Sequence, residues 1–286
     1  AGGGHDFWAA TIVYLAVLGL SAALAFELCW AERAPGISPA FLAPLAGVSA
    51  TLALSFWQSV HPEESWFALM DWLEKYIFPA EAKTVSPEFV RIGTRLAALE
   101  MIESGTTTYA DMYYFEEEIA KATRAAGLRG VLAQTIIQFP APDAKTPAEG
   151  LARAERFIQA FKDDSLIVPA VGPHAIYTND EAALRASAAL GRKYGVPVVI
   201  HLAETEDEIS SARERHRLTP TGYLESIGFL GPRTMAAHGV WMTDDDIRIL
   251  KQRGVGVSHN PESNMKLASG TAPVGKYLGA GVALGL

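Results

Sequence analysis

The stretch Val196-Pro-Val-Val-Ile-His201 is a short apolar run that ends in a histidine, and the chain repeats this pattern three more times. The other runs end at His174, His238 and His259, and a helix-like or turn-like stretch follows each of them. If each run is a strand of one parallel barrel, the four imidazoles lie at its carboxyl-terminal mouth, where barrel enzymes keep their chemistry. The pattern therefore predicts an active site.

From residue 61 onward, short apolar runs alternate with longer amphipathic stretches, which is typical of a parallel sheet built from βαβ units. The spacing is too regular for a two-half Rossmann sheet, and no GxGxxG motif opens a helix. The predicted fold is α/β: a (β/α)8 TIM-type barrel that is incomplete, because only seven strands can be counted. The expected strands are 106–112, 130–137, 166–172, 196–201, 234–238, 254–258 and 281–286. The expected helices are 86–104, 115–127, 146–162, 179–194, 206–227, 243–253 and 271–280.

Composition excludes several classes of protein. With 286 residues, 49% of them hydrophobic, the chain can bury a large core. The net charge of −8 and the absence of a Lys/Arg cluster argue against nucleic acid as a partner. The single cysteine, Cys29, excludes an internal disulfide and any Cys-rich zinc module. Any metal must therefore be held by histidines and carboxylates.

The first sixty residues differ from the rest. Between Phe7 and Val60 the only charged residues are Glu27, Glu32 and Arg33. The charge-free run 7–26 is long enough to span a bilayer as a helix. Three interpretations stay open: membrane helices, a buried packing segment, or a stretch that is not native to the rest of the chain.

These differences predict two parts, an apolar N-terminal segment over 1–60 and a partial barrel over 61–286. A seven-stranded barrel has two open edges whose backbone groups lack partners. We expect the apolar segment either to fill that gap in part, with a strand at 45–58, or to leave the domain poorly soluble.

The motif His201-Leu-Ala-Glu204 carries the strongest chemical signal. A neutral imidazole at a strand end suits a zinc ion, and metal-bound water is acidified to a pKa of about 7. A carboxylate three residues later can take that proton and pass it to a leaving nitrogen. The next acids, Glu206, Asp207 and Glu208, are better explained as residues that favour the positive end of the following helix.

The other strand-end residues receive less specific predictions. His238 has the same position on the next strand as His201, which favours a role in orienting or polarising water or substrate. His174 follows a Gly-Pro bend, and substrate binding and turn packing are equally good explanations. His259 opens a polar loop and receives no specific role, while Asp111 is expected to brace the mouth.

Ordered motifs over residues 66–286 resemble the amidohydrolase superfamily, in the branch that contains methylthioadenosine/S-adenosylhomocysteine deaminases and s-triazine chlorohydrolases. Six motifs in the same order make chance similarity a poor explanation. They are Met70-Asp-Trp-Leu-Glu-Lys-Tyr-Ile-Phe-Pro-Ala-Glu81, Ser104-Gly-Thr-Thr-Thr-Tyr-Ala-Asp-Met112, Gly172-Pro-His174, His201-Leu-Ala-Glu-Thr205, Ala237-His238 and Ser258-His-Asn-Pro-Glu-Ser-Asn-Met-Lys-Leu267.

The resemblance implies a barrel that holds one divalent metal, usually Zn²⁺, and hydrolytically removes ammonia from an aminopurine or a related heterocycle. It implies that His201 is a metal ligand, Glu204 the proton shuttle and His238 the residue that orients the water. It also implies that His174 and Glu81 contact the substrate, with Glu81 reaching ribose hydroxyls.

Two family features are missing from the sequence. The His-x-His pair that ends the family's first strand would fall around Leu52-Ala-Leu54, and no His-x-His occurs in the sequence. The family's last ligand, an Asp after the eighth strand, would follow Leu286. Of four expected ligands only His201 is present, so we expect impaired activity. The chain is either an incomplete copy of such an enzyme or a degenerate homologue.

Deamination of an adenosine-like nucleoside is the predicted function, because a leaving amine needs a proton that Glu204 can deliver, whereas chloride does not. The alternatives are an s-triazine-type chlorohydrolase and a non-catalytic, membrane-anchored barrel remnant. We expect a cytoplasmic protein, membrane-associated if residues 7–60 are genuine. The exact substrate and a homo-oligomeric state stay open.

Overall fold

The computed structural model describes residues 75–76 and 78–286, which belong to one compact unit, Ser65–Leu286. The predictions of membrane helices within 7–60 and of a strand at 45–58 lie outside the described residues. In the part of the chain that is described, no helix is both long and apolar enough to cross a bilayer.

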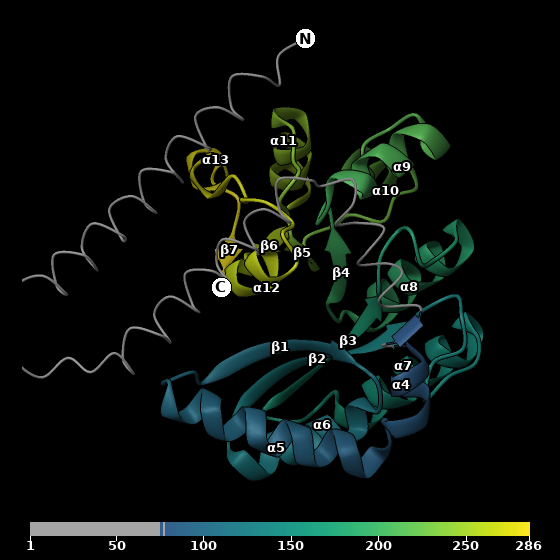
Figure 1. The fold of residues 1–286 in the computed structure, drawn as a ribbon, viewed down its shortest axis with the longest axis vertical. Helices are drawn as coiled ribbons and strands as arrows, with labels where there is room; N and C mark the ends of the chain where they lie inside the picture. The colour runs from purple at the N-terminus through teal and green to yellow at the C-terminus, as the bar shows by residue number, and fades with distance from the viewer. Residues whose placement is uncertain (1–74, 77) are drawn as a thin grey trace, which may run out of the picture. The chain divides into compact units, whose positions relative to one another are not determined.

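Seven parallel strands form one sheet, and their order in the sheet is their order in the sequence. This sequential parallel order, with helices between the strands (Figure 1), is that of a (β/α)8 barrel in which one strand is not accounted for. Within the described residues, β1 and β7 each pair with one neighbour only. The strands are β1 Thr108–Tyr113, β2 Arg129–Ile136, β3 Ile167–Pro173, β4 Val198–Leu202, β5 Thr234–His238, β6 Gly256–Ser258 and β7 Leu284–Gly285.

The helices begin and end where local chemistry predicts. Helix α8 has Asp180 as its N-cap, and Gly195 ends it in the left-handed conformation that glycine adopts without strain. Thr243 and Asp246 form a reciprocal capping box at the start of α11. The helices are α4 Phe78–Thr84, α5 Pro87–Glu103, α6 Glu116–Ala126, α7 Pro147–Phe161, α8 Glu181–Tyr194, α9 Glu206–His216, α10 Pro220–Ser226, α11 Asp244–Arg253, α12 Pro261–Lys266 and α13 Val274–Ala280.

All seven predicted strands and seven predicted helical regions are present, with three differences. The helix expected over 206–227 is two helices, because Arg217 takes a left-handed conformation and Pro220 starts a new helix. Helices α4 and α12, of seven and six residues, were not predicted, since they are too short to show a periodic apolar pattern.

The two faces of the sheet bury different side chains. On one face Met112, Ala133 and Val199 pack together with residues of neighbouring strands. On the other face Leu132 packs against Val90 of α5 and other helix residues. The first face is the inner face of the barrel, and the second is the outer face, which the helices cover.

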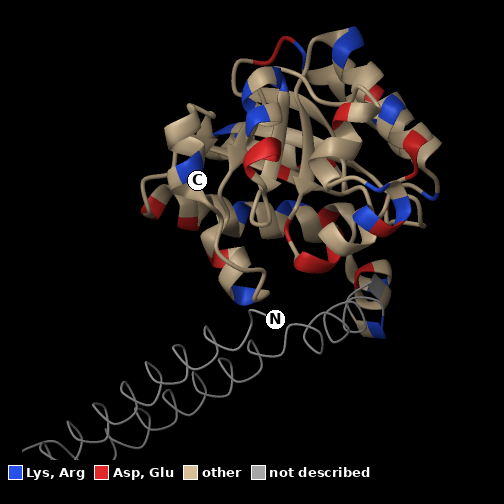
Figure 2. Cartoon of the chain, turned by 90° about the horizontal axis from the view of Figure 1, so that it is seen from above, with Lys and Arg blue, Asp and Glu red and all other residues tan. Residues whose placement is uncertain are grey.

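Lys/Arg and Asp/Glu residues are interspersed along the described part of the chain (Figure 2). Acidic residues gather in the first turns of helices, as in α11, where Asp244, Asp245 and Asp246 lie next to one another. This placement complements the positive end of the helix dipole.

Candidate active site

Three of the four strand-end histidines meet. His174 follows β3, His201 lies in β4 and His238 ends β5. The ring centroids of His174 and His201 are 4.8 Å apart, and those of His201 and His238 are 5.1 Å apart. His259 follows β6, where its N–H donates to Gly285 O at 2.8 Å and its buried Nδ1 has no hydrogen-bond partner among the described residues. The predicted cluster is confirmed for three of its four members.

The hydrogen bonds of this cluster indicate the tautomers of two rings. His238 Nδ1 lies 2.9 Å from the amide oxygen of Asn264, which can only accept, so Nδ1 carries a hydrogen. His238 Nε2 lies 3.1 Å from His201 Nδ1. When both rings are neutral, His201 therefore donates to His238 and keeps a lone pair on its own Nε2. That is the form an imidazole needs to bind a metal or accept a proton.

His174 is held in the same way by a different partner. Its Nδ1 lies 3.0 Å from the hydroxyl of Thr178, which also lies 3.2 Å from Ala175 O. When that hydroxyl donates to Ala175 O, the ring donates from Nδ1 and keeps a lone pair on Nε2. Burial, with a smaller effect of His238, lowers the pKa of His174 to about 4. Burial, followed by the neighbouring imidazoles, lowers the pKa of His201 well below its usual value, so both rings are neutral at pH 7.

Glu204 lies next to this cluster. Its side chain is 12% exposed, and its Oε1 is 3.6 Å from His238 Nδ1. Burial raises the pKa of Glu204, against the smaller opposing effect of His238. A carboxyl group whose pKa is raised toward neutrality can both take and return a proton.

Two residues at the ends of these strands have left-handed backbones without being glycine. Ala203 has φ 51° and His238 has φ 75°. An L-residue in this region costs about 1–2 kcal/mol, and such strain persists only where surrounding contacts impose it. Ala203 precedes Glu204 and His238 belongs to the cluster, so the packing of these turns sets where Glu204 and His238 point.

The next residue, Gly239, leaves no room for a side chain. Its φ is 56°, and a Cβ placed there would lie 2.6 Å from Tyr277 Oη. The hydroxyl of Tyr277, which is wholly buried, donates to Gly239 O. This contact ties the end of β5 to helix α13.

Glu81 and Asp111 lie away from the histidines. Glu81, on α4, accepts a hydrogen bond of 2.8 Å from Tyr113 Oη at the end of β1, and its role in binding substrate stays a prediction. Asp111 lies inside β1 and lines a groove against α5 together with Val90 and Thr94. The expectation that Asp111 braces the mouth is therefore wrong, because its position in β1 directs it into the helix layer.

Three supporting residues were missed or misinterpreted. Asn264 and Thr178 fix the rings of His238 and His174, but nothing in their local sequence sets them apart from other polar loop residues. Glu208 was taken for a helix-end charge, whereas its carboxylate accepts from the N–H groups of Ala203 and Glu204, at 3.0 Å each. The pattern Thr205-x-x-Glu208, a capping-box signature, could have shown that this side chain points back to the turn.

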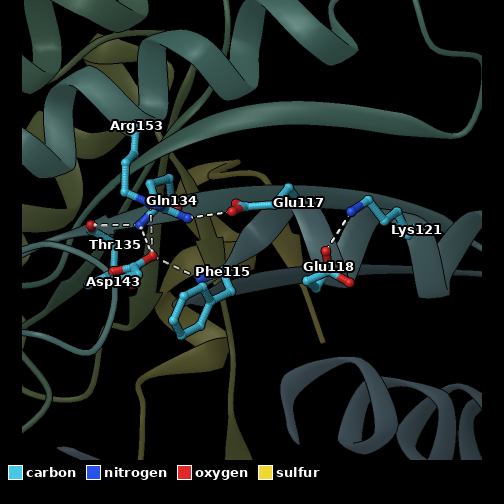
Figure 3. A network of polar contacts seen from close by, with 8 residues as sticks. All are labelled: Phe115, Glu117, Glu118, Lys121, Gln134, Thr135, Asp143 and Arg153. Carbon is cyan, nitrogen blue, oxygen red and sulfur yellow. Dashed lines mark hydrogen bonds and ion pairs between the residues drawn. The ribbon is translucent and has the colours of Figure 1, made fainter. Parts of the chain in front are cut away.

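A second buried network joins the loops that follow β1 and β2 (Figure 3). Asp143 Oδ2 accepts from the N–H of Phe115 at 2.8 Å and from Gln134 Nε2 at 2.9 Å. The same oxygen pairs with Arg153 Nε at 3.2 Å, and the Asp143 side chain is completely buried. These contacts hold the loop after β2 against the start of α6.

The sequential parallel sheet and the imidazoles at its strand ends define a barrel-type enzyme of the α/β class. A family model described as "Amidohydrolase family" matches residues 57–286. The chain therefore belongs to the amidohydrolase family.

Relatives of this chain include named deaminases. It is 48% identical over 214 residues to a 5-methylthioadenosine/S-adenosylhomocysteine deaminase of Thermodesulfovibrio yellowstonii, covering 75% of this chain and 49% of the relative. It is 47% identical over 217 residues to a 5'-deoxyadenosine deaminase of Methanocaldococcus jannaschii, covering 75% and 51%. The chain thus spans about half the length of the curated relatives it matches.

Solved structures show the same fold. An adenosine deaminase from Xanthomonas campestris with bound zinc is 36% identical with a TM-score of 0.73, covering 76% of this chain and 50% of that one. A triazine hydrolase from Arthobacter aurescens is 21% identical with a TM-score of 0.69, covering 76% and 52%. At that identity the second match shows the fold alone.

The described residues do not make a complete metal site. Among them, no group of three His, Cys, Asp or Glu side chains is placed to hold an ion. His201 fits as one imidazole ligand, because its Nε2 keeps a lone pair. A catalytic zinc needs about three protein ligands, so the others would have to come from outside the described residues.

Proposed function

We propose that this chain forms the Glu204-bearing part of a hydrolase that deaminates an adenosine-type nucleoside. The observation that carries the proposal is the contact of Glu204 Oε1 with His238 Nδ1, 3.6 Å, beside the hydrogen-bonded pair of His238 and His201. This arrangement places a buried carboxyl group of raised pKa next to two imidazoles. The named deaminases among the relatives agree with it in sequence.

In the proposed reaction, water adds to the ring carbon that bears the amine, and that carbon becomes a carbonyl as ammonia leaves. Of the two water protons, Glu204 relays one to the departing nitrogen, and the other ends on the ring nitrogen beside the reacting carbon, so the carboxyl group ends unchanged. His238 orients the water. His174 and Glu81 contact the substrate, with Glu81 reaching the ribose hydroxyls, since a carboxylate can accept from two neighbouring hydroxyls.

We propose a divalent metal, Zn²⁺, as the cofactor, with His201 as one of its ligands. When bound, such an ion acidifies water at neutral pH. Dechlorination of a triazine gains no support, because the triazine hydrolases resemble this chain in fold alone. A cytoplasmic location stays a prediction.

The test measures ammonia release from 5'-methylthioadenosine, S-adenosylhomocysteine and 5'-deoxyadenosine by the full chain supplied with Zn²⁺. Glu204→Gln should lower kcat by about 10²–10⁴-fold, the usual contribution of a positioned acid-base group. Glu206→Gln, an exposed carboxylate two residues away, is the matched control and should leave kcat unchanged. No turnover of any of the three nucleosides, or equal rates for wild type and Glu204→Gln, would overturn the proposal.

A further inference from the structure

The turn between β4 and α9 carries Glu204, and its conformation is unfavourable by itself. Ala203, the residue before Glu204, has φ 51° and is 1% exposed. The left-handed conformation costs an alanine about 1–2 kcal/mol. Contacts from elsewhere must therefore hold this turn, and their geometry decides where the Glu204 side chain points.

One set of contacts comes from the neighbouring turn after β5. Ala203 O accepts from the N–H groups of Val240 and Trp241, at 3.0 and 2.9 Å. Leu202 O accepts from the N–H of Gly239 at 3.0 Å. These bonds satisfy the carbonyl groups of the turn and join it to the residue that follows His238.

Among the described residues, the N–H groups of Ala203 and Glu204 both donate to one side chain, the Glu208 carboxylate. Oε1 accepts from Ala203 N and Oε2 from Glu204 N, each at 3.0 Å. Glu208 is 2% exposed and lies in the first turn of α9, where its own N–H donates to the hydroxyl of Thr205. Helix and turn are thereby fixed to each other through one side chain.

The ionised carboxylate is the form that this clamp requires, and it predominates above the pKa of Glu208, which burial raises to about 7. Its two oxygens both accept, so it can satisfy two N–H groups at once, whereas an amide offers one oxygen and one NH₂. Glutamine has the same size, but its amide oxygen could accept from only one of the two N–H groups. Its NH₂ group would face the other N–H, so that two donors would meet. Leaving a buried N–H without a partner costs about 1–3 kcal/mol.

We propose that Glu208 is a positioning residue that fixes the left-handed turn at Ala203 and so holds the Glu204 carboxylate against His238. The effect of Glu208 on catalysis rests on the proposed deaminase function. The effect of Glu208 on structure, which is the placement of Glu204 beside His238, is independent of that function. The two consequences are measured separately.

The experiment compares Glu208→Gln with Asp246→Asn in the full chain. Asp246 is the matched control: it is also 2% exposed, lies in the first turn of α11 and accepts from the backbone N–H of its N-cap Thr243, but it touches neither Glu204 nor Ala203. Amide hydrogen exchange at Ala203 and Glu204, and the NMR shifts of the His238 ring, report the turn without any turnover. Steady-state kinetics separate kcat from KM.

Glu208→Gln should speed exchange at both amides and shift the His238 ring signals. In an active enzyme it should lower kcat roughly 100-fold with KM changed less than about twofold, since a misplacement of about 1 Å costs that much. Asp246→Asn should change neither the ring signals nor kcat.

Unchanged exchange and ring signals in Glu208→Gln would overturn the proposal, as would equal kcat losses in the two variants. A wild-type chain that does not turn over nucleosides would sink the proposed function instead. The exchange and ring signals would still decide the role of Glu208 in that case.

Discussion

Two regions of the molecule differ in how many buried polar contacts their residues make. One is the pair of turns after β4 and β5, and the other is the edge formed by β1 and α5. At the two turns, the left-handed residues Ala203 and Gly239 are held by buried partners, the Glu208 carboxylate and the Tyr277 hydroxyl. At the β1 edge, Asp111 pairs with no cation among the described residues. Helix α5 there exposes an apolar stripe of Phe89, Ile92, Leu96, Leu99 and Ile102.

The difference shows which part of the barrel is stabilised by contacts among the described residues alone. Several buried contacts hold the turns that carry His201, Glu204 and His238. Within the described part of the chain, the β1 edge offers hydrophobic surface and backbone groups without a strand partner, which a neighbouring strand and helix cover in a closed barrel. Three substitutions test this contrast.

The largest change in the free energy of unfolding is expected for Gly239→Ala, in the turn after β5. The new methyl group would meet Tyr277 Oη at 2.6 Å on a backbone with φ 56°. Left-handed strain and overpacking together should lower the free energy of unfolding by about 4 kcal/mol, measured by urea denaturation. Gly279→Ala is the control, because it is exposed in α13 with no atom within 4 Å, and it should be neutral or slightly stabilising. Equal stability of the two variants would show that the turn after β5 is loose.

A smaller change, an increase in the free energy of unfolding, is expected for Asp111→Asn at the β1 edge. Burial raises the pKa of Asp111 from 3.8 to about 6. The folded state therefore binds this proton more tightly than the unfolded state, so wild-type stability should fall as pH rises from about 4 to 6 and stay reduced above that. The asparagine should remove this fall and add up to about 3 kcal/mol at pH 8, since one pKa unit corresponds to about 1.4 kcal/mol.

The measurement is urea denaturation of both proteins from pH 4 to pH 8. Asp163→Asn, whose side chain is 88% exposed, should leave the pH profile as it is. A pH profile that is identical in wild type and Asp111→Asn would mean that Asp111 has a cationic partner in solution.

The smallest effect is expected for Leu96→Glu on the exposed stripe of α5. Leu96 is 60% exposed, so a charged residue there should change the free energy of unfolding by no more than about 0.5 kcal/mol. Leu132→Ala, a change at a fully buried position of β2, provides the scale and should cost about 2–5 kcal/mol. If Leu96→Glu costs more than about 1 kcal/mol, the stripe is covered in the folded protein and the contrast between the two regions fails.

Much of the fold could be predicted, because each strand of a parallel barrel is a short apolar run and each helix an amphipathic stretch with its own caps. The strand ends followed from the same pattern, and parallel strands bring their carboxyl ends to one side. His174, His201 and His238 could therefore be expected to meet. The short helices α4 and α12 could not be predicted, since six or seven residues show no usable period.

The supporting residues of the site could not be found in the same way. Asn264 reaches His238 from 26 positions away along the chain. Sequence spacing carries no information about such contacts.

The sequence by itself determined the family, the order of strands and helices, and the residues that end the strands, because these depend on local propensity and on motifs read along the chain. Only the tertiary structure decided that Glu204 lies against His238, that His201 keeps a free Nε2, and that Glu208 holds the turn. The physical reason is that hydrogen bonds between neighbouring strand ends depend on backbone conformation within about 1 Å, which residue types alone do not fix.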